Sequence, residues 1–451
     1  MSAEDETPFA FSPSDDKNAA GDLQKKKLIR IIIIVVALLV VVGVIVLIVV
    51  LASGGKDDGD KSDKNPTPQP DEEDDDNKNW PEDTSTNYIS ATYTCAQYQE
   101  CRFYDDRTVN HTEEISSITV DDKRTAVEPK KVFSEEGAKK VILKFNQKVS
   151  DMNSFFFDAA NLLTVDFTNF DTSQLTIMSN MFKACLALKS ITWGPNFSTS
   201  KVTKMDNLFN SLSTYPFTID VSKFDTSKVQ DFSYMFTHCD TIKMLNLKNF
   251  DTSSATDMSG MFQGCDELTS LDLSSFDTSN VLEMNEMFAQ CYKLAGLTVK
   301  FDTSKVTNMN GMFTNCEVLE TVDLSSFKTS SVTVMDNMFK NCLGLKNVIQ
   351  TFTSEKLERA QRMFSGDVKL ESIDLSGMDG SAMKDMQNMF NGCSSLTSID
   401  LSNFSGKSAT DVKKVFYGIS STGTLTYDSS KMNPLIIASL PEDYTKVDVK
   451  E

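Results

Sequence analysis

Aspartates recur at one position of a repeating pattern in this sequence, and their carboxylates have the chemistry to bind a ligand. Each lies between two apolar residues, so the alternation of a β-strand would turn all the carboxylates to one outward face. Hard cations prefer oxygen ligands, so such a row could bind calcium or a cationic ligand. The alternative is a solvated row that keeps a sheet soluble. The candidates are Asp166, Asp220, Asp272, Asp323, Asp374 and Asp400.

Cysteines share another repeat position, where packing explains them better than chemistry. Units without cysteine carry Ala159, Leu212, Asp367 or Ile419 there, and the apolar substitutes indicate a buried slot in which a free thiol acts as a small hydrophobe. Stacked units would bring neighbouring cysteines within disulfide range, so partial pairing stays open. The column lacks paired histidines or carboxylates, so no metal and no other cofactor is predicted. The cysteines are Cys185, Cys239, Cys265, Cys291, Cys316, Cys342 and Cys393.

Two further kinds of modification site lie in or near this pattern. Cys95 and Cys101 are close in sequence and outside the repeats, so a local disulfide is expected, with two free thiols as the alternative. Asn-x-Ser/Thr sequons make Asn110, Asn196 and Asn403 candidates for glycosylation. Asn110 is the better candidate, because the other two occupy a repeat position whose equivalents lack the hydroxyl residue.

Enzyme chemistry finds little support in the composition. The chain has only 2 histidines, and it contains no nucleophile elbow, P-loop, dinucleotide fingerprint or zinc motif. Carboxylates are plentiful, so a glycoside hydrolase remains the weaker alternative. The formal net charge of −20 argues against a nucleic-acid partner, because phosphate binding needs a basic surface. We therefore predict a protein that is not an enzyme.

A repeat of about 26 residues must position all these groups. Each unit contains a Met-Phe pair or its equivalent, beginning at Phe155 and ending at Val415. The alternating stretch Leu271-Asp272-Leu273 indicates a short strand. The spacing of Val306, Met309, Met312, Phe313 and Cys316 by three and four indicates one face of a helix, with Ser304 as N-cap and Ser227, Ser253 and Ser279 in equivalent places.

These periods predict an α/β fold: a right-handed, leucine-rich-repeat-like solenoid of about eleven strand–helix coils with a parallel sheet, preceded by one transmembrane helix. We expect the repeat solenoid at residues 148–420, an N-terminal cap region at 86–147 and a C-terminal cap at 421–451. No single unit can bury its apolar side, so the core must be shared between neighbouring coils.

The N-terminal part of the sequence predicts a membrane anchor. Residues 28–52 include 22 consecutive apolar or small residues, long enough to span a bilayer. The basic cluster before them places residues 1–27 in the cytoplasm as a tail and the repeats outside the cell, in a single-pass cell-membrane protein. Residues 53–85 form an acidic stalk rich in Pro and Gly, predicted to be disordered. A cleaved signal peptide is the alternative.

The unit MFxxCxxLxxLDLSxFDTSxVxxM resembles the 26-residue repeat of the BspA-like leucine-rich-repeat surface proteins, which also occurs in mycoplasmal surface lipoproteins. The resemblance covers about Leu143 to Ile419, and the tail after it resembles the C-terminal cap of such arrays. It implies an extracellular solenoid used in adhesion or surface recognition, and it implies no catalytic residues.

The function expected from these observations is a membrane-anchored, cell-surface adhesion or recognition module without catalysis. Its expected partners are the membrane, through one span, and an extracellular protein or glycan. The alternative is a surface receptor or co-receptor that signals through the short tail at residues 1–27.

Overall fold

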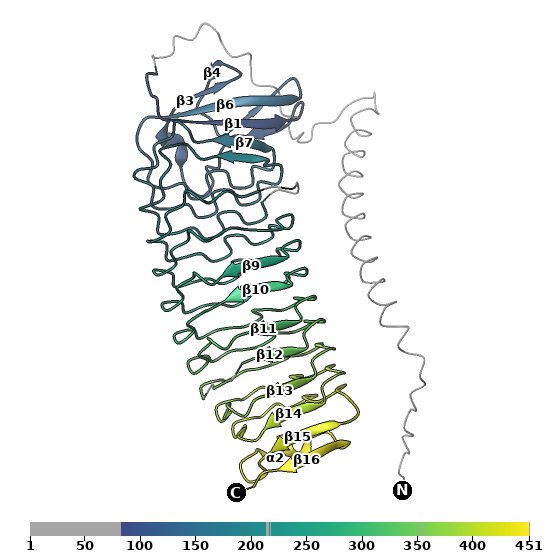
Figure 1. Cartoon of the computed structure of the whole chain (residues 1–451). Coiled ribbons are helices and arrows are strands. Elements are labelled where there is room, and N and C mark those ends of the chain that lie inside the picture. The colour runs from purple at the N-terminus through teal and green to yellow at the C-terminus, as the bar shows by residue number, and fades with distance from the viewer. Residues whose placement is uncertain (1–82, 213–215, 217, 351, 354, 451) are drawn as a thin grey trace, which may run out of the picture. The chain divides into compact units, whose positions relative to one another are not determined.

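Each unit of the repeat forms one coil of a β-solenoid in the computed structural model (Figure 1). The structure describes residues 83–212, 216, 218–350, 352–353 and 355–450, all within the unit Thr67–Glu451. Neighbouring coils pair through short parallel strands with a register of one unit, as between Leu271 and Leu297. The strands are β7 (Leu162–Asp166), β8 (Ser190–Thr192), β9 (Ser270–Leu273), β10 (Gly296–Val299), β11 (Thr321–Asp323), β12 (Asn347–Ile349), β13 (Ser372–Asp374), β14 (Ser398–Leu401), β15 (Gly423–Tyr427) and β16 (Tyr444–Asp448).

A second line of pairing follows one residue of every coil. Single parallel bridges run without interruption from Asp151 to Asp411, one per coil, which gives about ten turns. The repeat and the solenoid predicted from the sequence are therefore confirmed. Strands alternate buried and exposed side chains, as in β9, where Leu271 and Leu273 face the core.

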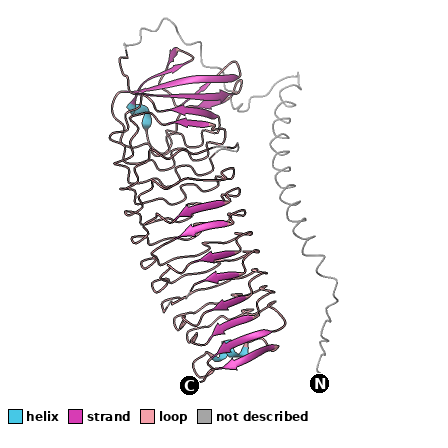
Figure 2. Ribbon diagram, in the orientation of Figure 1, coloured by secondary structure: helices cyan, strands magenta, loops and turns pink. Residues whose placement is uncertain are grey.

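The predicted α/β class is wrong, because turns replace the helix of each coil (Figure 2). The N–H of Met261 donates to the Met258 carbonyl at 3.3 Å, closing a tight turn, whereas the N–H of Gly260 donates to the Asn285 carbonyl of the next coil at 2.8 Å. This alternation continues along the segment, so its backbone groups are satisfied by turns and by the neighbouring coil, not by bonds four residues apart.

The spacing of apolar residues by three and four is compatible with a helix and also with the observed run of turns. Two left-handed residues four positions apart bend each turn segment, for example Asn337 (φ 58°) and Asn341 (φ 61°), and keep every third or fourth side chain pointing inward. Ser304 caps no helix; its N–H donates to the Asp302 carboxylate at 3.0 Å. Among the described residues the only α-helix is α2 (Pro434–Ala438), and η1 (His111–Glu114) is a short 3-10 helix.

A continuous column of phenylalanine rings forms the centre of the core. The rings are buried and nearly parallel, with centroids 5.3–6.0 Å apart and interplanar angles of 3–17° between neighbours. Each ring fills the space above the next, so the core is shared by all coils. The column contains Phe156, Phe182, Phe209, Phe236, Phe262, Phe288, Phe313, Phe339, Phe364, Phe390 and Phe416.

The Asp-Thr-Ser turns join adjacent coils. The Asp251 carboxylate accepts the N–H of Ser253 at 3.0 Å within the turn. The buried Thr226 hydroxyl of the preceding coil donates to the Asp251 carbonyl and accepts the Asp251 N–H, both at 2.9 Å. Thr199 and Thr303 make the same pair of bonds to the next coil. This motif therefore closes the turn and also fixes the stacking register.

Both ends of the array are covered. At the N-terminal end the sheet order is β4-β3-β6-β1-β7-β8, so antiparallel β1 covers the edge of the first coil strand, and β2 pairs separately with β5. At the C-terminal end α2 and β16 close the core, with Ile436 and Tyr444 buried. The cap strands are β1 (Tyr88–Cys95), β2 (Glu100–Arg102), β3 (Ile115–Val120), β4 (Lys123–Thr125), β5 (Lys130–Val132) and β6 (Gly137–Phe145).

The membrane prediction also needs correction. Across the described part of the chain, none of the helices has the length and apolar character needed to cross a membrane. This finding stands against the predicted single-pass localisation with extracellular repeats. The segments expected to form the cytoplasmic tail (1–27), the membrane anchor (28–52) and most of the stalk (53–82) lie outside the described residues.

Candidate functional site

The predicted row of aspartates lies on the strand side of the coils, where each carboxylate caps its own turn. Every one accepts a hydrogen bond from the backbone N–H two residues later, at 2.8–3.1 Å. The hydroxyl and N–H of Ser274 hold the pKa of Asp272 below its usual value, and Ser325 does the same for Asp323. These six residues are Asp166, Asp220, Asp272, Asp323, Asp374 and Asp400.

The row is interrupted in ways that bear on cation binding. Of the bridged strands, only β13 and β14 place two of these aspartates side by side, Asp374 and Asp400. Thr192 pairs with Asp166, Thr298 with Asp272 and Ile349 with Asp323. Within the described ranges, no three His, Cys, Asp or Glu side chains are grouped so that they could hold a metal ion.

A second exposed row runs beside the aspartates and completes what we call the strand face. The second row consists of the residue two positions before the aspartate position in each of the strands β9 to β15, and its side chains are small and mostly polar. Together the two rows make a surface in which neighbouring strands are about 4.8 Å apart. The second row in β9 to β15 contains Ser270, Gly296, Thr321, Asn347, Ser372, Ser398 and Thr424.

The cysteine column lies inside the core. All seven thiols are buried and free, and each Sγ donates to a phenylalanine carbonyl of the preceding coil at 3.0–3.2 Å. Burial raises the pKa of Cys316 to about 12, and it raises the pKa of the other thiols as well. Buried, protonated thiols are chemically inert, so this column contributes packing.

Asp367 occupies the cysteine position in one coil. It is fully buried; its Oδ1 accepts the Cys342 N–H at 2.8 Å, and its Oδ2 has no hydrogen-bond partner. Burial raises the pKa of this carboxyl well above its usual value. The Asp367 carboxyl therefore occupies the place that a cysteine thiol fills in neighbouring coils, and it has no contact with solvent.

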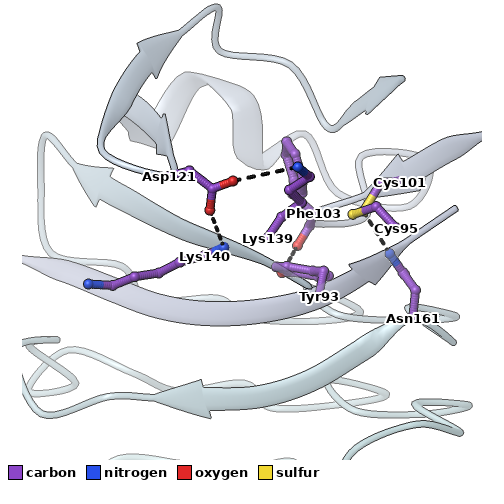
Figure 3. Close-up of a disulfide and its surroundings, with 8 residues drawn as sticks. All are labelled: Tyr93, Cys95, Cys101, Phe103, Asp121, Lys139, Lys140 and Asn161. Atoms are coloured by element: carbon purple, nitrogen blue, oxygen red, sulfur yellow. Dashed lines mark hydrogen bonds and ion pairs between the residues drawn. A yellow bond between two sulfur atoms is a disulfide. The ribbon is translucent and has the colours of Figure 1, made fainter. Parts of the chain in front are cut away.

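Cys95 and Cys101, for which a disulfide is expected, are joined in one (Figure 3). The bond is buried in the N-terminal cap, where the Tyr93 hydroxyl donates to the Phe103 carbonyl at 2.5 Å. The Asn161 amide of the first coil donates to Cys101 Sγ at 2.9 Å, so the disulfide contacts the solenoid as well as the cap. The disulfide therefore has a structural role in the N-terminal cap.

All three sequon asparagines are exposed. Asn110 is the N-cap of η1, with its side-chain oxygen accepting the Thr112 N–H at 3.3 Å. The Asn403 amide donates to the Ser376 carbonyl of the preceding coil at 2.8 Å, an interaction that a glycan on this nitrogen would alter. Asn196 lies in an exposed turn before buried Phe197.

Our sequence interpretation missed a non-repeating feature on the turn side of the coils. Tyr234 and His238 occupy the two left-handed positions of one coil, with φ of 56° and 52°. The next coil has glycine at both positions, Gly260 and Gly264. Among the described coils no other has two aromatic residues, or two glycines, at this pair of positions. The signal was present in GMFQGC, where two glycines are four residues apart, but the helical interpretation gave them no role.

Comparison with known proteins identifies one family. Its matches cover residues 110–215, 189–291, 267–373 and 320–428, an overlapping series that spans more than two thirds of the chain. The overlap is what a family made of the same repeating unit would produce. No curated protein matches the chain. The chain therefore belongs to the family described as Mycoplasma protein of unknown function, DUF285.

Proposed function

We propose that this chain is a non-catalytic adhesion or recognition protein whose strand face takes up an extended protein or glycan ligand. The observation that carries the proposal is the strand face itself: two mostly exposed rows of small polar and acidic side chains that recur along the coils. A ligand with repeating units could make the same contact several times along such a surface.

The way the coils are held together supports this proposal. The phenylalanine column and the buried threonines of the Asp-Thr-Ser turns link each coil to the next. A surface carried on such a frame is ordered before the ligand arrives, so binding loses little conformational entropy.

The role of the carboxylates favours binding over catalysis. Each aspartate of the strand face uses one oxygen to accept a backbone N–H of its own turn, and the arrangement recurs in coil after coil. Catalysis by carboxylates usually depends on one unique constellation in a pocket, with groups whose pKa values are driven apart. An aspartate that caps the same turn in several coils is not a unique constellation of this kind.

Kinship with the BspA-like surface proteins forms part of the same proposal. The unit MFxxCxxLxxLDLSxFDTSxVxxM, with its buried Met, Phe, Cys and Leu and its exposed Asp, is the basis for it. Adhesion and surface recognition are the functions that this kinship implies.

The proposal predicts that bulky charged groups on the strand face abolish ligand binding. Full-length protein is first presented to an array of glycans and extracellular-matrix proteins, and the best ligand is then titrated. Ser372 and Ser398 pair in register on the exposed face, so Ser372→Lys with Ser398→Lys should obstruct the ligand and raise its Kd by about tenfold or more.

The matched control places two lysines elsewhere on the solenoid. Thr256→Lys with Thr410→Lys alters exposed residues beside the bridge ladder, away from the strand face, and should leave the Kd within about twofold. Equal loss in both double variants, or no ligand on the whole array, would refute the proposal.

A further inference from the structure

Tyr234 and His238 depart from the repeat in a way that packing of the core does not require. Both adopt left-handed backbone conformations, which are unfavourable for a bulky side chain such as tyrosine. Other coils place asparagine, glycine or other smaller residues at many of these positions. The rings lie outside the core: His238 has a side-chain exposure of 48%, and Tyr234 is partly buried. Residues that keep an unfavourable backbone conformation are often part of a binding surface.

The next coil is built to receive the two rings. A Cβ atom at position 260 would lie 2.4 Å from the Tyr234 ring, and one at position 264 would lie 2.3 Å from His238 Nδ1. A Cβ atom at either position would force the rings to shift, so Gly260 and Gly264 let the rings lie directly against the backbone. The departures in the two coils therefore match each other, and together they form one surface, which we call the aromatic shelf.

The shelf has acidic surroundings. Asp240 Oδ1 lies 3.7 Å from His238 Nδ1, and both side chains are about half exposed. Glu286, one coil beyond the glycines, accepts a hydrogen bond from the Gln263 amide at 2.9 Å. The nearby Asp240 carboxylate raises the pKa of His238, with a further contribution from Asp266. Partial burial, followed by the charges of Glu286 and Asp257, raises the pKa of Tyr234.

We propose that the aromatic shelf binds arginine or lysine side chains of a basic peptide segment in a partner protein. Cations are attracted to aromatic faces, and a guanidinium both stacks on a ring and pairs with carboxylates. The overall charge of −20 would speed the encounter with a basic segment. A neutral sugar would use the rings but would draw no benefit from the charges. The shelf lies on the turn side of the coils, so it is a second surface, separate from the strand face of the proposed function.

The test compares the full-length protein with a variant that carries asparagine at both positions, as one other coil does. Tyr234→Asn with His238→Asn removes both rings, and asparagine is well tolerated at positive φ. Isothermal titration with an acetylated hexa-arginine peptide, at physiological salt, should show a Kd at least about tenfold higher in the variant. The melting temperature should stay the same or rise, which separates lost binding from lost folding.

Two further variants sharpen the result. Asn337→Ser with Asn341→Ser changes the same two backbone positions in a coil without rings, and it should leave the hexa-arginine Kd within about twofold. Asp240→Asn with Asp266→Asn keeps the rings but removes two charges, and it should weaken binding and reduce its salt dependence.

Three outcomes would refute the proposal that the aromatic shelf binds basic side chains. Hexa-arginine binds the wild type and the ring variant equally, it does not bind at all, or maltohexaose binds in its place. The lysine substitutions on the strand face test the proposed function separately. The two proposals can therefore fail independently.

Discussion

At the scale of single residues, Asp367 shows what happens when a carboxyl occupies a core position that other coils fill with a thiol. Its neighbours in the column are thiols that donate to a backbone carbonyl, whereas Asp367 places a carboxyl with an unpartnered oxygen in the same dry slot. Burial raises its pKa well above the ordinary 3.8. A carboxyl whose pKa is higher in the folded state than in the unfolded state stabilises the folded protein when it is protonated. This contribution is complete below pH 3.8, the unfolded-state pKa, and is lost as the pH rises through the pKa of the folded state.

We therefore predict that Asp367→Cys stabilises the protein at neutral pH. The variant removes a buried group that lacks a partner, and the gain in free energy of unfolding should be about 1–3 kcal/mol at pH 7. Because the carboxyl becomes neutral in both states in acid, the gain should shrink towards pH 4. Urea denaturation in reducing buffer at pH 4, 5.5 and 7 measures it.

The reverse substitution is the control for this prediction. Cys393→Asp places a second carboxyl in the column and should destabilise the protein, most strongly at neutral pH. A gain for Asp367→Cys that grows as the pH falls would contradict the assignment.

At the scale of elements, the turn matters more than the strand. Coil strands of only three to five residues contribute few hydrogen bonds, as in β11 and β13. The turn segments bond to the next coil at every second residue, and the buried threonines add one or two bonds between coils. Stacking is therefore distributed around the whole coil and is not confined to one sheet.

Thr226→Val tests this distribution. Valine has nearly the shape of threonine, but it would leave both the N–H and the carbonyl of Asp251 without their Thr226 partner in a partly buried turn. We expect a loss of about 1–3 kcal/mol in the free energy of unfolding, measured by urea denaturation.

Thr298→Val serves as the matched substitution, because Thr298 is exposed on β10 and valine suits a strand. It should change stability by less than about 0.5 kcal/mol. Equal effects of the two substitutions would show that the buried hydroxyl does not hold the coils together.

At the scale of the whole molecule, the two caps solve the problem of open ends in a repeat array. At one end β1 covers the first coil strand. At the other, the Tyr444 hydroxyl donates to the Leu396 carbonyl, and Ile436 packs so closely on Gly406 that a Cβ there would lie 2.3 Å from it. The last strand, β16, carries charged Lys446 at its centre, which discourages pairing with another chain.

Removing the C-terminal cap should therefore cause self-association. A chain truncated after residue 431 loses α2 and β16 and exposes both the apolar end of the core and the edge of β15. Size-exclusion chromatography with light scattering should show large assemblies, whereas removal of residues 450–451 alone should leave the mass per particle unchanged. A monodisperse truncated chain would show that the cap is dispensable.

The sequence by itself determined the period, the stacking and the composition of the core. Apolar residues such as Met261, Phe262 and Leu271 recur at fixed places because no coil can bury them alone, and this requirement is visible in one dimension. The Asp-Thr-Ser turns and the outward aspartates follow from local rules of the same kind.

Only the tertiary structure decided between helix and turn, and only it revealed the aromatic shelf. Inward spacing by three and four residues fits a helix, but in a stacked coil the backbone finds partners in the next coil, about 26 residues away, and a run of turns satisfies it. Likewise Tyr234 and Gly260 are unremarkable apart, and their fit exists only because the solenoid places one directly against the other.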